Sequence, residues 1–360
     1  MKELISPKQA IALIIAFILD GSIILPTASE GGRNLWISII IAIILSFIIF
    51  NVYYNIQMLY PGKDFYEICQ NSLGKVLGNM INILYIWYFI HLGALTLRDF
   101  GEFMNVLTMP ETPKTVIMII STLICVYMVK KGIEVMGRFA LFATILTLIN
   151  VSILASMLTP KIDIKNILPI MGNGIEPVML GAWSAFTFPF GECVIFLTVL
   201  NNLNNHKLIK KVYYRGLVFG GFFILIMSVY ELSILGEKIY GSLYFPAYTA
   251  LSRIRIGEFI QRLEIILGIN LNIFGIIKIS LCLYAVCIGI SRIIKIDNYK
   301  ILALPAGLIM FNLANILYDN IMELSSWTAN IFKYYALPFE VFFPVLILVL
   351  GKIKKAGKEA

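Results

Sequence analysis

The chain has 360 residues, of which 59% are hydrophobic and only 14% are charged, and its formal net charge is +8. Soluble domains carry about 25% charged residues and lack repeated apolar stretches of ~20 residues, so the composition predicts an integral membrane protein embedded in the lipid bilayer. The long apolar runs without strand-like alternation predict that it is all-α. The basic residues lie in short loops between apolar stretches, where they report membrane topology rather than nucleic-acid binding.

Ten apolar stretches are long enough to cross about 30 Å of hydrocarbon as helices. In chain order, the ten predicted spans are 7–28, 34–58, 76–108, 113–130, 137–158, 178–201, 211–235, 262–291, 299–318 and 330–350. We expect one transmembrane domain over 1–360, made of two five-helix repeats (1–158 and 178–350) and a tail (351–360).

The distribution of Lys and Arg predicts the orientation of the spans. With the N-terminus in the cytoplasm, 18 basic residues fall on the cytoplasmic side and 9 on the other side. This bias follows the positive-inside rule, so both termini are expected in the cytoplasm. The first span then starts inside and the sixth starts outside, which makes the two repeats inverted copies of each other.

Two connections have the spacing of surface helices. In the outer connection, residues 252–264 place apolar side chains at helical intervals, which predicts a short amphipathic helix over the outer mouth. Residues 61–76 predict a similar helix on the inner side.

The first span is interrupted at Ile18–Pro26, which reads Ile-Leu-Asp-Gly-Ser-Ile-Ile-Leu-Pro. In lipid, an interrupted helix leaves backbone groups without partners unless protein or water supplies them, so interruptions mark binding sites. Gly21 and Ser22 would offer backbone groups to a ligand carboxylate, and Asp20 needs a partner, a proton or water. A simple kink at Gly and Pro is the alternative.

The sixth span is interrupted at Phe186–Glu192, which reads Phe-Thr-Phe-Pro-Phe-Gly-Glu. Pro189 removes one backbone donor and frees the carbonyl of Ala185, and freed carbonyls would suit a ligand ammonium. Thr187 and Gly191 are further candidates at this break. Glu192 would bind the same ammonium or pair with a basic residue. The rings of Phe186 and Phe188 crowd the break, which favours a small ligand.

The two breaks are predicted to lie at one depth. Asp20 lies 13 residues after Pro7, and Pro189 lies 12 residues after Pro177. Both are therefore ~18–20 Å into their helices, near the membrane midplane. A paired break in each half of a polytopic chain is the strongest sequence indication of a transporter-type binding site.

The third span carries a polar stripe at helical spacing, made of Tyr88, His91, Arg98 and Glu102. Tyr88 and His91 are candidates for the pocket wall. For His91, packing with a hydrogen bond is favoured over a proton-relay role. Arg98 would pair with Glu102 one turn on, or gate the outer path.

The eighth span contains a lysine deep in the membrane. Lys278 lies 14 residues from Arg292, about 21 Å along a helix, so it cannot reach the surface and needs a buried anion. Asp20, Glu192 and Glu340 are the candidates. Ser280 and Tyr284 share a helix face and are candidates for the pocket, with hydrogen bonding between helices as the alternative.

Several segments resemble the GerAB/GerKB endospore germination permeases. The matching segments are Ile5-Ser-Pro-Lys-Gln9, Phe188-Pro-Phe-Gly-Glu192, Arg253-Ile-Arg-Ile-Gly-Glu-Phe259 with Arg262-Leu-Glu264, and Lys278-Ile-Ser280 with Tyr284. The resemblance implies the amino acid–polyamine–organocation superfamily, with a LeuT-like fold whose first and sixth helices are broken. It also implies the B subunit of a nutrient germinant receptor in the spore inner membrane, with A and C subunits as partners. In some sodium-independent relatives of this fold a lysine amine replaces a bound cation, and Lys278 is a candidate for that role.

Three functions fit this pattern. The first is a sensor of a small nutrient such as an amino acid, bound at the midplane between the two breaks. The second is an amino acid transporter, with proton coupling through Asp20, Glu192 or Lys278. The third is a structural or ion-conducting subunit whose pocket is empty. No cofactor or metal is expected, and no nucleophile, base and orienting group occur in a pattern that would indicate an enzyme.

Overall fold

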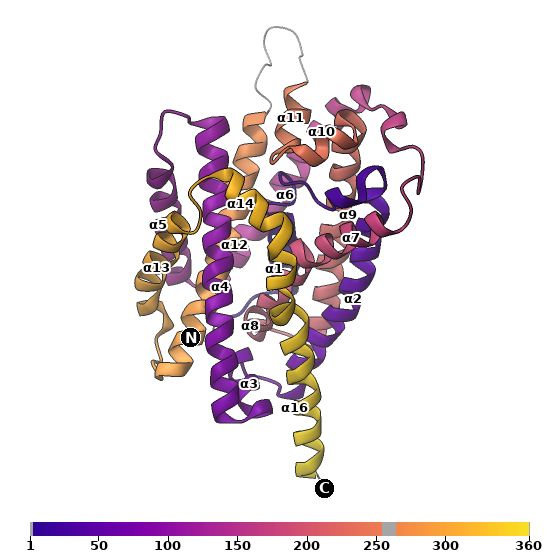
Figure 1. Cartoon of the computed structure of the whole chain (residues 1–360). Coiled ribbons are helices and arrows are strands. Elements are labelled where there is room, and N and C mark those ends of the chain that lie inside the picture. Colours follow the sequence, from indigo (N-terminus) through magenta and orange to yellow (C-terminus); the bar gives the residue numbers. More distant parts are fainter. Residues whose placement is uncertain (1–2, 254–263, 360) are drawn as a thin grey trace.

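The computed structural model describes residues 3–253 and 264–359, which are nearly all helical (Figure 1). The α-helices are α1 Pro7–Leu19, α2 Leu35–Leu59, α3 Phe65–Leu73, α4 Lys75–Phe103, α5 Lys114–Lys131, α6 Ile133–Leu158, α7 Glu176–Ala185, α8 Phe196–Val199, α9 Ile209–Leu235, α10 Glu237–Ser242, α11 Pro246–Ser252, α12 Glu264–Ile294, α13 Ala303–Ile316, α14 Ile321–Trp327, α15 Lys333–Tyr335 and α16 Phe343–Glu359. We call the end that carries α10 and α11 the upper end, and the end at the C-terminus the lower end.

Eight helical stretches of the described ranges are long and apolar enough to cross a membrane. Two further helices complete the ten predicted spans: α5, which has 18 residues, and α1, which has 13. The first span was expected to reach residue 28, but α1 ends at Leu19 because the chain breaks there. The tenth helical stretch begins at Ile321 instead of 330, since α14, α15 and α16 follow one another with π-helical turns between them.

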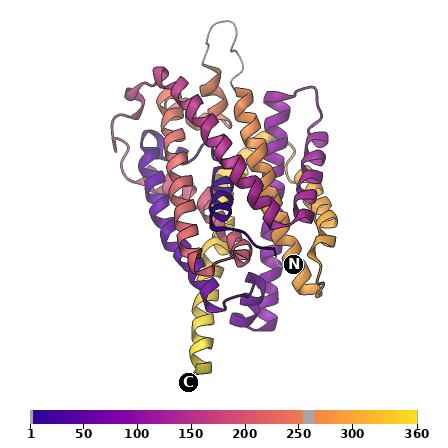
Figure 2. The same ribbon diagram turned by 180° about the vertical axis from the view of Figure 1, so that it is seen from behind.

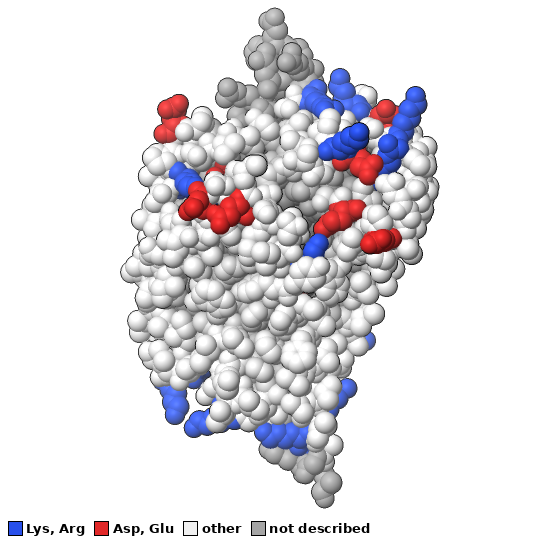
Figure 3. All heavy atoms as spheres, viewed as in Figure 1, with Lys and Arg blue, Asp and Glu red and all other residues white. Residues whose placement is uncertain are grey.

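One face of the molecule shows the charge distribution of a membrane protein. Figure 3 shows a broad belt without charged residues, bounded by Lys, Arg, Asp and Glu at the upper end and by Lys and Arg at the lower end. Such a belt matches the hydrocarbon layer, which excludes ionised side chains.

The buried helix α1 lies in the middle of the bundle (Figure 2). It packs against α6, α9 and α12. Glycines on α9 allow the close approach, since a Cβ at Gly216 would lie 2.4 Å from Ile14, and one at Gly220 would lie 2.9 Å from Ile18. Small residues at such crossings let transmembrane helices come into contact.

The start of α1 is fixed by its own sequence. Ser6 and Gln9 form a capping box, in which the Ser6 N–H donates to Gln9 Oε1 at 2.7 Å and the Gln9 N–H donates to Ser6 Oγ at 3.3 Å. Pro7 occupies the first helical position, where no N–H is needed. Ile5 pairs with Leu203, so the N-terminus is held against the end of the sixth span.

The two predicted surface helices have different outcomes. The segment 61–76 contains α3, which Asp64 caps through the Glu67 N–H at 3.0 Å. In the outer connection, α10 and α11 are short helices at the upper end, but most of the segment predicted to be amphipathic, 252–264, lies outside the described residues.

Candidate functional site

The first break follows α1 at Asp20. Asp20 has extended backbone angles, and Gly21 has a φ of 69°, in the region that favours glycine. The Ser22 hydroxyl donates to the Ile18 carbonyl. The N–H groups of Ile24 and Leu25 donate to the Gly21 carbonyl at 2.9 and 2.7 Å. Local hydrogen bonds therefore satisfy part of the backbone that the broken helix leaves open.

The second break lies at Phe188, where the backbone leaves the helical region at φ −124° and ψ 115°. Pro189 follows through a cis peptide bond, and the chain resumes as a 3-10 turn over Gly191–Ile195. The Tyr53 hydroxyl lies 3.2 Å from the Gly191 carbonyl and 2.6 Å from the Glu340 carbonyl. This break is thus bound to neighbouring helices through its backbone.

The Phe188 ring fills the space between the breaks. A Cβ at Gly21 would lie 3.1 Å from Phe188 Cζ, closer than side chains normally approach. The predicted ligand gap between Gly21–Ser22 and Thr187–Gly191 is therefore occupied by this ring in the present conformation. Phe188 also places its ring centroid 5.2 Å from Lys278 Nζ, a cation–π distance.

Lys278 of α12 joins the two breaks. Its Nζ lies 2.7 Å from Glu192 Oε2 and 3.7 Å from Asp20 Oδ2, and all three side chains are at most 3% exposed. The second oxygen of Asp20, Oδ1, has no hydrogen-bond partner in the described part of the chain. One ammonium thus serves two buried carboxylates, a charge balance that favours a further cation or a proton.

Two cavities lie above this ion cluster. The inner chamber, of about 20 Å³, is lined by Asp99, Glu192, Lys278 and Thr96 together with leucine and phenylalanine side chains. The vestibule, of about 160 Å³, opens beyond it toward the upper end. The residues that line both cavities are Leu25, Phe188, Thr328 and Phe332. These four form the partition between chamber and vestibule.

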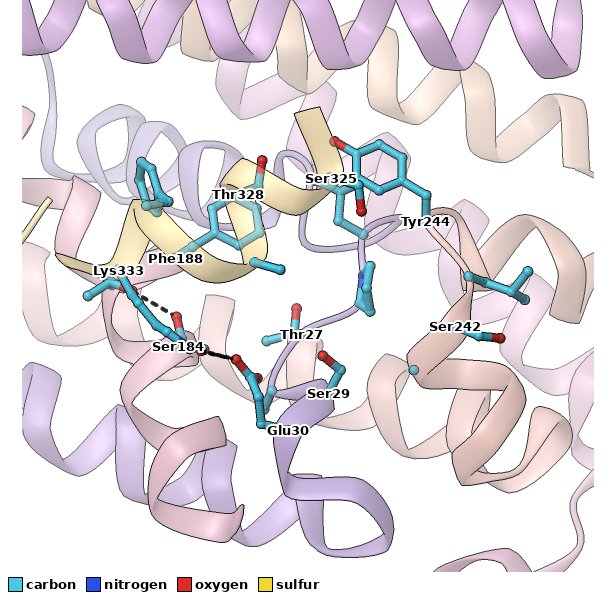
Figure 4. Close-up of a pocket in the computed structure, with 18 residues that line it drawn as sticks. Thr27, Ser29, Glu30, Ser184, Phe188, Ser242, Tyr244, Ser325, Thr328 and Lys333 are labelled. Atoms are coloured by element: carbon cyan, nitrogen blue, oxygen red, sulfur yellow. Dashed lines mark hydrogen bonds and ion pairs between the residues drawn. The ribbon is translucent and has the colours of Figure 1, made fainter. Parts of the chain in front are cut away.

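The vestibule is polar and carries one ion pair. Glu30 accepts a hydrogen bond from the Ser184 hydroxyl at 2.5 Å, and Lys333 Nζ lies 3.3 Å from the same carboxylate. Figure 4 shows these three side chains on one side of the cavity and Ser325 and Tyr244 on the other.

Glu340 lies beside the second break but does not pair with Lys278. It is fully buried, and its Oε1 accepts a hydrogen bond from the Tyr88 hydroxyl at 2.9 Å. Its other oxygen, Oε2, lies so close to Gly191 that a Cβ atom at position 191 would be only 2.1 Å from it. Glu340 and Tyr88 therefore support the second break instead of pairing with Lys278.

Arg98 lies in a separate cluster at the upper part of α4. Its Nε is 2.8 Å from Glu102 Oε1, and its Nη1 donates to the carbonyls of Ala314 and Asn315 at 3.2 and 3.3 Å. Lys114 of α5 approaches the same Glu102 oxygen at 2.7 Å. These contacts tie α4 to α5 and α13, and Arg98 lines neither cavity.

Several predicted pocket residues lie away from the two cavities. His91 sits among the rings of Trp87, Trp327 and Tyr335, at centroid distances of 5.9, 5.2 and 5.0 Å. Tyr284 accepts a hydrogen bond from Asn202 Nδ2 at 2.8 Å, near the lower end.

Other predicted site residues lie near the second break but do not line either cavity. Phe186 stacks on Trp183 with centroids 5.7 Å apart, and Ser280, Pro189 and Gly191 are buried without lining either cavity. Thr187 does line the vestibule.

Asp99 and Tyr244 were not among the predicted site residues. Asp99 of α4 lines the inner chamber, and its Oδ1 accepts a hydrogen bond from the Tyr244 hydroxyl at 2.6 Å. Burial, followed by the Asp99 charge, raises the pKa of Tyr244 well above its usual value, so Tyr244 acts as the donor. Asp99 itself, an acidic residue inside the third span, was a sequence signal for this site. The expectation that part of the outer connection covers the outer mouth did not single out Tyr244.

In the ranges that the structure describes, no group of three or more His, Cys, Asp or Glu side chains is placed to hold a metal ion. The five cysteines are buried and unbridged.

Comparison with known proteins gives concordant matches over almost the whole chain. A family model described as "Spore germination protein" matches residues 4–323. Spore germination protein KB of Bacillus subtilis (strain 168) is 31% identical over 362 residues, covering 99% of this chain and 97% of that protein. Spore germination protein GerQB of Bacillus cereus is 26% identical, covering 91% of this chain and 90% of its own length.

Solved structures show the same fold. Mhp1, a nucleobase-cation-symport-1 family transporter in a closed conformation with bromovinylhydantoin bound, superimposes with a TM-score of 0.64 at 12% identity, covering 98% of this chain and 91% of Mhp1. MhsT in complex with L-phenylalanine gives a TM-score of 0.63 at 11% identity, with 97% and 99% covered. At such identities the likeness shows the fold alone, which is the LeuT-like membrane fold.

Proposed function

Because the chain belongs to the spore germination permease family, we propose that it is the subunit through which a germinant receptor in the spore inner membrane senses a small nutrient, most simply an amino acid. Receptor A and C subunits would be its partners. In this proposal both termini face the cytoplasm, so the vestibule faces the outer side. The repeats span 1–158 and 178–350, and 351–360 is a cytoplasmic tail.

The observation that carries the proposal is the position of Lys278. It links Asp20 at the first break and Glu192 at the second break, and both Lys278 and Glu192 line the inner chamber. A ligand that enters the chamber meets these charges and changes their balance. Since a ligand shifts a conformational equilibrium only by its differential affinity for the two states, such a contact is what a sensor requires.

The breaks give the protein segments that can rearrange. Residues at Gly21 and Phe188 are outside regular helix geometry, while α4 and α12 run uninterrupted beside them. A change at the Lys278 cluster would therefore move the ends of the broken helices relative to the continuous ones, and partner subunits would read that movement.

A deletion and complementation experiment tests the sensing role. Spores that lack this chain should lose germination on one nutrient class and regain it when the wild-type chain is restored. The same chain carrying Lys278→Met should fail to restore the response, and its protein level is measured by immunoblot because the substitution is also expected to destabilise the chain. Germination of the deletion spores at the wild-type rate on every nutrient would contradict the proposal.

Transport is the second candidate, and the fold shared with Mhp1 and MhsT favours it. Uptake of labelled amino acids into proteoliposomes separates the two functions. The sensing proposal predicts saturable binding without accumulation against a gradient. Concentrative uptake, with or without a proton gradient, would establish a transporter instead.

A further inference from the structure

The geometry points to Asp99 as the anchor for a ligand ammonium group, with the ammonium in the inner chamber and the rest of the ligand in the vestibule. This inference rests on the proposed sensing function and names the chemical class of the germinant: a small molecule with a free primary amine. An α-amino acid is the simplest member of that class.

The chamber has an excess of negative charge. Asp99 and Glu192 are the carboxylates that line it, and among the described residues Lys278 is the one ammonium in its wall. Lys278 is already paired with Glu192 at 2.7 Å and with Asp20, outside the chamber, at 3.7 Å, which leaves Asp99 without a cation. Arg98, although next in sequence to Asp99, is bound to Glu102 and to backbone carbonyls. Buried carboxylates without counter-charges are unfavourable in a membrane, so the chamber favours a cation.

Asp99 is the carboxylate that an entering group can reach. Glu192 is 1% exposed and already bound to Lys278, whereas Asp99 is partly exposed and lines the chamber. In the described part of the chain, its hydrogen bond comes from the Tyr244 hydroxyl. A ligand ammonium would donate to the same carboxylate, either in place of the Tyr244 hydroxyl or beside it.

The size and lining of the chamber suit an ammonium better than a metal ion. About 20 Å³ holds one water-sized group, and a protonated amine has that size. Hard metal ions such as Ca²⁺ and Mg²⁺ require about six oxygen ligands, while half of the residues that line the chamber are leucine or phenylalanine and one is the cationic Lys278. The aromatic faces of Phe188 and Phe332 instead suit an organic cation.

The vestibule provides for the other end of the ligand. Its volume of about 160 Å³ is ample for a small amino acid, and the partition residue Thr328 lines both cavities. Thr27 Oγ1 is buried without a hydrogen-bond partner in the described part of the chain, although its residue lines the vestibule. Figure 4 shows this hydroxyl directed toward Phe188 and Thr328. A ligand carboxylate or hydroxyl near the partition would give Thr27 the partner that it lacks.

Two substitutions separate ligand recognition from a structural role of the Asp99–Tyr244 bond. Asp99→Asn keeps an acceptor for Tyr244 but removes the charge, whereas Tyr244→Phe removes the hydrogen bond and keeps the charge. If Asp99 binds the ammonium, the first variant should lose about 10- to 150-fold in affinity, as expected for a charge-assisted hydrogen bond. The second should lose much less affinity, since Asp99 keeps its charge.

The probes are the protein amino acids, their N-acetyl derivatives and D-glucose, applied to the purified full chain in nanodiscs with binding read as a thermal shift and by equilibrium dialysis. The inference predicts that at least one free amino acid binds, that its N-acetyl derivative binds at least ten-fold more weakly, and that Asp99→Asn weakens binding much more than Tyr244→Phe does. It is overturned by N-acetyl derivatives that bind as well as free amino acids, by equal losses in both variants, or by no binding of any amine.

Failure of the inference and failure of the sensing function are distinguishable. If D-glucose binds and no amine does, the ammonium site is ruled out, but the chain can still be a sensor of another nutrient class. The sensing function itself is tested separately, by the germination of spores that lack the chain on the same set of compounds.

Discussion

Two buried clusters of charge lie in the same bundle, and they connect different kinds of segments. The Lys278 cluster joins two interrupted helices to α12, through three side chains that are at most 3% exposed. The Arg98 cluster joins the continuous helices α4, α5 and α13, and it includes Lys114, whose side chain is 30% exposed. We therefore expect the first cluster to control a conformation that can change, and the second to hold continuous helices together.

The largest effect is expected at the first cluster. Lys278→Met leaves Asp20 and Glu192 buried without a cation, which should destabilise the protein by about 3–5 kcal/mol. Unfolding in mixed micelles measures the loss. Because acid protonates both carboxylates and so removes their uncompensated charge, the variant should recover stability as the pH falls. A variant equally unstable at acidic and neutral pH would show that the loss comes from packing.

A glycine pair tests whether the first break is tightly packed. Gly21 and Gly62 both have positive φ, at 69° and 83°, but only Gly21 faces a side chain, that of Phe188. Gly62→Ala should cost about 1–2 kcal/mol from its backbone alone. Gly21→Ala should cost about 1–3 kcal/mol more, since the added methyl group displaces the Phe188 ring. Equal losses in the two variants would mean that Phe188 moves away freely.

The bulkier change Gly21→Trp tests the function of the same break. It should abolish the germination response while protein remains detectable in the spore membrane by immunoblot, because the indole has no space beside Phe188. A full response from Gly21→Trp spores would exclude this break from the binding path.

A smaller effect is expected at the Arg98 cluster. Arg98→Met removes hydrogen bonds to Glu102 and two carbonyls, but Glu102 retains Lys114 at 2.7 Å. The expected loss is about 1.5–3 kcal/mol in the same unfolding measurement, without recovery in acid. A loss larger than that of Lys278→Met would reverse the ranking of the two clusters.

The smallest effect is expected at the vestibule ion pair. Lys333→Met removes one partner of Glu30, which still accepts a hydrogen bond from Ser184. Partly exposed pairs contribute about 0–1 kcal/mol, so stability should change little. If the ligand enters through the vestibule, the variant should instead change the germination rate, and an unchanged rate would place the entry path elsewhere.

Much of the fold could be predicted from the sequence, because long apolar stretches, helix caps and the two helix interruptions are local signals. It also indicated that Lys278 needs a buried anion, from the distance to the nearest helix end. It could not show that the Phe188 ring fills the gap beside Gly21, since a side-chain rotamer depends on packing. Nor could helical spacing show that Ser280 and Tyr284, which share a face of α12, lie away from both cavities.

Asp99 is a residue of the candidate site that the sequence did not single out. Its importance depends on Tyr244, which comes from a connection folded back over the bundle. The periodicity of the third span drew attention to Arg98 and Glu102, which proved to bind each other. Long-range placement of a loop thus decided which charged residue of that span faces the cavities.

A double-mutant cycle between Lys278→Met and Glu192→Gln tests whether the Lys278 ion pair connects the two breaks energetically. With unfolding free energy as the readout, and the pair Lys278→Met with Glu340→Gln as the control, the ion pair at 2.7 Å should give a coupling energy of at least about 1.5 kcal/mol. The control should give much less, because Glu340 is bonded to Tyr88. Effects of Lys278 and Glu192 that add to within about 0.5 kcal/mol would contradict an energetic connection at this position.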